Sequence, residues 1–176
     1  MSSASKDDRS RKEYYSFFIY GSFLIVQLVL AYFYYNHLRL DMVANIGWFV
    51  FMVSGVFGWL PIITFRRKGG VPRGESYIQT TVLVDSGIYS VVRHPQYFAG
   101  VLISLATVLI SQYWVNALLF FPVAAGFYWD TLRADRNLIE KFGSEYETYM
   151  EEVSGMNPLK GILRKVSGND RSNDQR

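Results

Sequence analysis

Uncharged, apolar runs of membrane length alternate with charged segments along this chain. Residues 17–35 and 43–65 each lack a charged side chain. Either run can cross a hydrocarbon core of about 30 Å as a helix that rises about 1.5 Å per residue. We therefore predict a membrane-spanning helix in each run, rather than two buried helices of a soluble bundle. The polar residues Gln27 and Ser54 within these runs are expected to form hydrogen bonds between helices.

A third uncharged run, residues 97–129, is too long for one span and too short for two full spans. The polar sequence SQYWVN at 111–116 divides it near its middle. We therefore predict two short helices joined by a tight turn, with Pro122 kinking the second. The three runs together predict an all-α integral membrane protein with four transmembrane helices in two hairpins, joined by a cytoplasmic loop.

The remaining segments are polar or amphipathic. Residues 1–16 form a polar N-terminal tail, residues 17–165 a single membrane domain, and residues 166–176 a tail whose composition predicts disorder. Within the cytoplasmic loop, the short β-branched sequence TTVLV at 80–84 is extended in character.

Residues 132–153 are typical of an amphipathic helix. Apolar side chains recur at helical spacing with charged residues opposite, which predicts a helix lying on the membrane face. Gly143 is expected to weaken this helix or to break it into two. The apolar stripe consists of Leu138, Phe142, Tyr146, Tyr149 and Val153.

Positive charge is concentrated on one side of the predicted arrangement. If both termini are cytoplasmic, Arg39 is the only one of the 18 lysine and arginine residues on the far side. This distribution follows the positive-inside rule and explains the net charge of +3 without a nucleic-acid partner. We therefore expect a multi-pass protein in contact with membrane lipids, with the termini and the 66–96 loop in the cytoplasm.

The composition excludes several kinds of chemistry. The chain contains no cysteine, which excludes disulfides, zinc–thiolate sites and cysteine nucleophiles. Because His37 and His94 are its only histidines, we assign no metal site. His37 is expected to be a solvated loop residue.

The sequence GIYSVVRHPQYFAG at 87–100 places charged residues directly before an apolar run. Proline is favoured in the first turn of a helix, so Pro95 is predicted to begin the third membrane helix. Arg93 and His94 then lie at a helix N-terminus, where the positive end of the dipole suits a carboxylate or phosphate. Arginine adds a forked donor, and histidine can donate or accept a hydrogen bond.

Two tyrosines flank this sequence. Tyr89 and Tyr97 offer aromatic faces to a flat base or a cation. Arginine and tyrosine at a membrane boundary can equally be anchors at the water–lipid interface. The residue pattern by itself leaves both interpretations open.

Two spaced motifs resemble the isoprenylcysteine carboxyl methyltransferase family, which is related to the phospholipid methyltransferases. The first is VLVDSGIYSVVRHPQYFAG, and the second is LIEKFGSEYETYM, followed by a late Pro158. The resemblance covers roughly residues 45–160 and includes an uncharged hairpin between the motifs. The matching residues are Gly87, Tyr89, Arg93, His94, Pro95, Tyr97, Gly100, Phe142, Gly143, Glu145, Tyr146 and Tyr149.

This resemblance implies S-adenosyl-L-methionine as the cofactor. Arg93 and His94 are our candidate catalytic residues. The positions that match the family's cofactor contacts are Thr81, Val82, Leu83 and Val84, largely through their backbone, together with Tyr89, His94, Pro95, Gln96 and Tyr97.

The chain departs from the family pattern at the head of the last helix. The family usually has an arginine four residues before a Glu-Glu pair, and these places hold Asp130 and Ala134–Asp135. Asp135 either replaces the missing glutamate contact to the cofactor or caps the amphipathic helix. Asp130 and the out-of-register Arg133 are the candidate substrate-binding residues, unless Asp130 points to water and pairs with Arg133 or Arg136.

The resemblance predicts a membrane methyltransferase that acts on the carboxylate of a prenylated cysteine or on another lipidic substrate. Methylation of a phospholipid amine is an alternative within the same class. A reductase similar to the sterol reductases, using NADPH, and a non-enzymatic membrane scaffold are alternatives from other classes.

Overall fold

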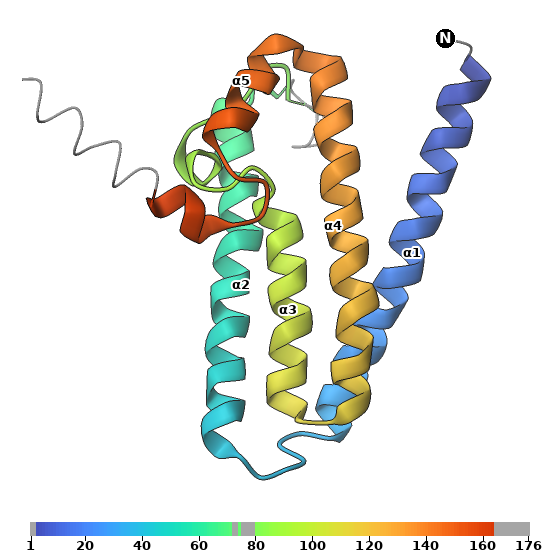
Figure 1. Cartoon of the computed structure of the whole chain (residues 1–176), viewed down its shortest axis with the longest axis vertical. Coiled ribbons are helices and arrows are strands. Elements are labelled where there is room, and N and C mark those ends of the chain that lie inside the picture. The colour runs from blue at the N-terminus through green and yellow to red at the C-terminus, as the bar shows by residue number, and fades with distance from the viewer. Residues whose placement is uncertain (1–2, 72–73, 75–79, 164–176) are drawn as a thin grey trace, which may run out of the picture. The chain divides into compact units, whose positions relative to one another are not determined.

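The computed structural model describes residues 3–71, 74 and 80–163. All regular structure within these residues is helical (Figure 1), which confirms the all-α part of the predicted fold class. The helices are α1 (Ser3–Phe33), α2 (Asp41–Lys68), a 3₁₀ helix η1 (Gly87–Ser90), α3 (Pro95–Ser111), α4 (Trp114–Phe142) and α5 (Ser144–Glu152). A further helical stretch covers residues 158–163. The predicted tail at 166–176 lies outside the described residues.

Two of these helices are long and apolar enough to cross a membrane. They are α2 and α4, whereas α3 and the apolar part of α1, Phe18–Phe33, are shorter apolar helices. The membrane character expected from the sequence is therefore supported by α2 and α4. The count of four spans stays a prediction.

The chain divides into two compact units, and residues 1–54 and 100–129 form the first. A buried polar network joins its helices. The Gln27 side chain donates to the carbonyl oxygen of Asn116 (2.9 Å) and accepts from the hydroxyl of Ser104 (2.7 Å). The interhelical role predicted for Gln27 is thus confirmed. The Ser54 hydroxyl instead donates to the carbonyl oxygen of Phe51 in its own helix (2.6 Å), so the same prediction is wrong for Ser54.

The predicted turn inside the third apolar run is confirmed in this unit. Helix α3 ends at Ser111 and α4 begins at Trp114. Between them, Gln112 has a positive φ of 54°, and its side-chain amide donates to Asn36 Oδ1 (2.8 Å) and to the carbonyl oxygen of Leu40 (2.9 Å). These bonds tie the turn to the loop between α1 and α2.

The second helix of this hairpin is longer than predicted, because α4 continues past Trp129 to Phe142. Its sequence has no glycine or proline after Gly126, and charged residues such as glutamate, lysine and arginine are good helix formers. The helix therefore does not stop where the apolar run stops. It ends at Gly143, whose φ of 61° and ψ of −137° lie in a region that glycine adopts readily.

Residues 55–99 and 130–176 form the second unit. The predicted amphipathic helix at 132–153 is split here into the last turns of α4 and the whole of α5, so Gly143 breaks it in two (Figure 1). Its apolar stripe packs in the interior of the protein rather than on the membrane face. Tyr146, Tyr149 and Val153 are buried against Leu83, Leu138, Ile139, Phe142 and Met150.

The β-branched segment at 80–84 forms no strand with any described residue. It is instead attached to the glycines that follow α2. The backbone N–H groups of Thr81 and Val82 donate to the carbonyl oxygen of Gly69 (2.9 and 3.3 Å), and the Thr81 hydroxyl donates to that of Gly70 (2.9 Å). These contacts fix an irregular loop beside the site described next.

Candidate functional site

The second unit contains a cavity of about 370 Å³, within the size range of small-molecule sites. Four segments line it: the end of α2, the 80–84 loop, the sequence from Tyr89 to Tyr97, and the α4–α5 region. Most residues predicted from the sequence lie on its wall, namely Val82, Leu83, Val84, Tyr89, Arg93, His94, Pro95, Gln96 and Tyr97.

Four predicted site residues are not among the described residues that line the cavity: Thr81, Asp130, Arg133 and Asp135. Asp130 and Arg133 form an ion pair with each other (3.4 Å) and are partly buried. Asp135 lies inside α4, so it does not cap a helix.

The cavity wall also includes residues that the sequence reasoning missed. Ala134, Asn137, Leu138 and Lys141 are spaced i, i+3, i+4 and i+7 on α4, which places them on one face of the helix. That spacing is a signal present in the sequence, but the predicted apolar stripe contains only Leu138 of these four residues. Phe65 and Thr80 were also missed, and Phe65 stacks on Tyr89 with ring centroids 4.6 Å apart.

Pro95, at the start of α3, sets the position of Arg93 and His94. Helix α3 begins at Pro95 as predicted, which leaves Arg93 and His94 in the turn before it. The backbone N–H groups of Arg93 and His94 donate to the carbonyl oxygens of Ser154 and Gly155 (both 3.0 Å). Ser154 and Gly155, which follow α5, therefore fix the backbone of Arg93 and His94.

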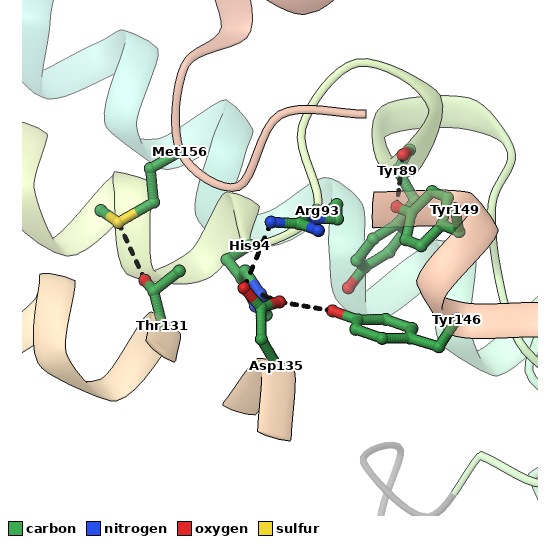
Figure 2. Close-up of polar contacts among 8 residues, drawn as sticks. All are labelled: Tyr89, Arg93, His94, Thr131, Asp135, Tyr146, Tyr149 and Met156. Atoms are coloured by element: carbon green, nitrogen blue, oxygen red, sulfur yellow. Dashed lines mark hydrogen bonds and ion pairs between the residues drawn. The ribbon is translucent and has the colours of Figure 1, made fainter. Parts of the chain in front are cut away.

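The Asp135 carboxylate accepts hydrogen bonds from three side chains, although Asp135 is not among the residues that line the cavity (Figure 2). Its Oδ1 accepts from His94 Nε2 (2.6 Å) and from the Tyr146 hydroxyl (2.7 Å), and its Oδ2 accepts from Arg93 Nη2 (3.2 Å). His94 and Asp135 are each 7% exposed. Hydrogen bonds to an ionised carboxylate are stronger than those between neutral groups, so these bonds orient both the imidazole and the guanidinium.

The Arg93 guanidinium retains unused donors. Its Nε and Nη1 are buried and have no hydrogen-bond partner among the residues that the structure describes. Leaving a buried donor unpaired costs about 1–3 kcal/mol. A carboxylate bound beside Arg93 would satisfy such donors, so the arrangement suits an anionic group.

Two buried tyrosines complete this side of the site. Burial raises the pKa of Tyr146, and its hydrogen bond to the negative Asp135 raises it further. Burial also raises the pKa of Tyr149, although the charge of Arg93 acts in the opposite direction. Both hydroxyls therefore stay protonated and act as donors, Tyr149 to the carbonyl oxygen of Tyr89 (2.5 Å; Figure 2).

The described residues thus form a helical protein with two helices long and apolar enough to cross a membrane and a cavity of small-molecule size lined by Arg93 and His94. A sequence model of the family described as phospholipid methyltransferase matches residues 43–144, more than half of the chain, and the chain belongs to this family. The family expected from the two sequence motifs is thereby confirmed.

The chain is also 34% identical over 123 residues to the protein-S-isoprenylcysteine O-methyltransferase of Schizosaccharomyces pombe. The match covers 63% of this chain and 52% of that protein, so the chain spans about half the length of this relative. No solved structure matches the chain. The family description and the name of the relative both denote methyltransferases.

Proposed function

We propose that this protein is an S-adenosyl-L-methionine-dependent methyltransferase that modifies a lipidic substrate at the membrane boundary. The observation that carries the proposal is the Arg93 guanidinium, which has two buried, unpartnered nitrogens beside His94 on the wall of an otherwise largely apolar cavity. Arg93 and His94 are the pair to which we assign the central roles.

The cavity suits the expected cofactor in size and in the chemistry of its wall. Arg93 and the positive end of α3 would hold the carboxylate of the cofactor's amino-acid part. The aromatic faces of Phe65, Tyr89 and Tyr97 would contact the adenine ring or the positive sulfur. When bound, S-adenosyl-L-methionine supplies a methyl group on a positively charged sulfur.

In this proposal Asp135 acts on the cofactor through other residues. Its hydrogen bond occupies His94 Nε2, so only Nδ1 of the imidazole is left for a bound group. Arg93 is held through Nη2, and its buried Nε and Nη1 form no hydrogen bond with a described residue. The largely apolar wall lowers the local dielectric, which strengthens each electrostatic contact inside the cavity.

The leading acceptor is a carboxylate on a prenylated cysteine, the group that the name of the S. pombe relative implies. A carboxylate is already ionised at neutral pH and requires no general base, so positioning is sufficient for the reaction. The pairing of Asp130 with Arg133 offsets the negative charge that would otherwise repel such a substrate. The family description supports a second acceptor, a phospholipid amine. Neither the family match nor the S. pombe relative supports the alternatives of an NADPH-dependent reductase or a non-enzymatic membrane scaffold.

We further propose that four helices cross the membrane: the apolar part of α1, then α2, α3 and the uncharged part of α4. The site and both termini would be cytoplasmic. The basic residues Arg66, Arg67 and Lys68 at the end of α2 and the single far-side Arg39 support this orientation.

Calorimetry with S-adenosylhomocysteine on the detergent-solubilised protein tests the cofactor assignment. We expect binding that His94→Ala and Tyr89→Ala each weaken by about 1–3 kcal/mol, the range for a lost buried polar or aromatic contact. His37→Ala is the control and should bind like the wild type. Equal affinity in all four folded proteins would refute the assignment. Turnover with a farnesylated cysteine and with an amine-headgroup lipid would then distinguish the two acceptors.

A further inference from the structure

Residues 154–163, which we call the strap, pack against the backbone that carries Arg93 and His94. Their first contacts are the two backbone hydrogen bonds from Arg93 and His94 to Ser154 and Gly155. Their last contact is at Gly161, which approaches Val91 so closely that an added Cβ would stand 1.9 Å from the Val91 carbonyl oxygen. The side of the strap that carries Gly161 therefore packs closely against the rest of the second unit.

The opposite side of the strap is apolar and exposed. In the helical stretch at 158–163, the spacing i, i+3, i+4 places Leu159, Ile162 and Leu163 on one face, and Gly161 lies across from them. The three side chains are 70%, 49% and 69% exposed. Lys160 is exposed beside them, and the sequence continues with Arg164 and Lys165.

The small area of this apolar face and the cations next to it favour a lipid bilayer over a protein as its partner. A stable protein interface buries about 800 Å² on each partner, far more than three side chains of a six-residue stretch provide. A bilayer boundary, in contrast, accepts a short apolar face flanked by cations, because the side chains enter the acyl region and the cations meet anionic headgroups. The chain already belongs to a membrane family and carries apolar helices of membrane length.

We propose that the strap is a membrane-inserting element whose partner is the lipid bilayer. Leu159, Ile162 and Leu163 enter the headgroup–acyl boundary, and the Gly161 side is thereby pressed against Val91. Lipid contact on one face of the strap then supports, on the other face, the backbone that positions Arg93 and His94. This coupling is independent of which acceptor the enzyme methylates.

The absence of cysteine in the chain makes the insertion directly measurable. Single cysteines at positions 159, 162 and 163 would carry an environment-sensitive fluorophore in liposomes that contain lipids with a nitroxide on the acyl chain near the headgroup. For a face inserted about 5–10 Å into the boundary, we expect the nitroxide to remove more than about half of the emission at all three positions. A label at Glu147, exposed on α5, is the matched control and should lose little.

Quenching at the control level at all three positions would overturn the proposal, and so would cross-linking between copies through these cysteines. The measurement requires neither cofactor nor substrate, so its failure and the failure of the proposed function are distinguishable.

The coupling to the site has its own test in lipid nanodiscs. The combined substitution Leu159→Ser, Ile162→Ser and Leu163→Ser changes only exposed side chains, so the protein should fold. We expect it to weaken S-adenosylhomocysteine binding several-fold, whereas Lys160→Ser alone should have little effect. Wild-type affinity in the triple variant would overturn the coupling. Gly161→Ala disturbs the same contact from the protein side and should weaken binding as well.

Discussion

At the scale of single residues, the Asp135 carboxylate accepts hydrogen bonds from His94, Tyr146 and Arg93 without lining the cavity. The family pattern suggested a direct cofactor contact or a helix cap at this position. Asp135 does not cap a helix, because it lies inside α4. Its carboxylate supplies the counter-charge for the guanidinium and occupies one nitrogen of the imidazole. We infer that Asp135 is a positioning residue for the pair that faces the ligand.

Replacing the Asp135 carboxylate by an amide removes its charge but keeps its shape. Asp135→Asn keeps the side-chain volume but leaves the Arg93 guanidinium buried without its counter-charge, which should destabilise the protein by about 3 kcal/mol. Tyr146→Phe removes one hydrogen bond to the same carboxylate and should cost only about 1 kcal/mol. Unfolding of the detergent-solubilised proteins measures both changes. Equal losses in the two variants would contradict the role of the Arg93–Asp135 pair.

The buried tyrosines predict how stability depends on alkaline pH. A pKa raised in the folded state means that the folded protein keeps protons that the unfolded chain releases near pH 10. The tyrosines therefore stabilise the fold fully below about pH 10, and this contribution is lost as the pH rises further. We expect the melting temperature of the wild type to fall more steeply above pH 10 than that of Tyr146→Phe/Tyr149→Phe. Parallel curves would show that neither hydroxyl is buried in solution.

At the scale of elements, glycine and proline set the boundaries that could be predicted from the sequence. Pro95 begins α3, and Gly143 separates α4 from α5, as the chemistry of these residues indicates. The contacts of Asp135 with His94 and Arg93 could not be predicted, because they join residues 41 and 42 positions apart. The burial of Tyr146 and Tyr149 was missed for the same reason. An amphipathic pattern identifies the apolar face of a helix but not what covers it.

The backbone at Gly143 offers a test that involves no steric clash. An added Cβ would meet nothing within 4 Å, so Gly143→Ala introduces only the strain of this backbone conformation (φ 61°, ψ −137°), about 1–3 kcal/mol. Gly55, inside α2, also has open space around its Cβ position, and there alanine should be neutral or stabilising. A lower melting temperature for Gly143→Ala but not for Gly55→Ala would fit this account. Equal melting temperatures would mean that α4 and α5 join in another backbone conformation.

At the scale of the whole molecule, charge distribution and helix length together predict the orientation in the membrane. The 18 lysine and arginine residues, apart from Arg39, lie in the polar segments that we assign to the cytoplasm. Such an asymmetry directs insertion. The lengths of α2 and α4 support membrane crossing on independent grounds, since they follow from the helix bounds rather than from charge.

Single-cysteine labelling tests this orientation without background, because the natural chain contains no cysteine. Leu38, exposed between α1 and α2, should react with a membrane-impermeant maleimide on intact cells. Glu147, exposed on α5, should react only after the membrane is permeabilised. The expected difference arises because the two residues are separated by an odd number of spans in the four-helix arrangement. Labelling of Glu147 on intact cells, or protection of Leu38, would place the cavity on the far side of the membrane or change the number of spans. A cytoplasmic cofactor could then reach Arg93 and His94 only if the site opened through the bilayer.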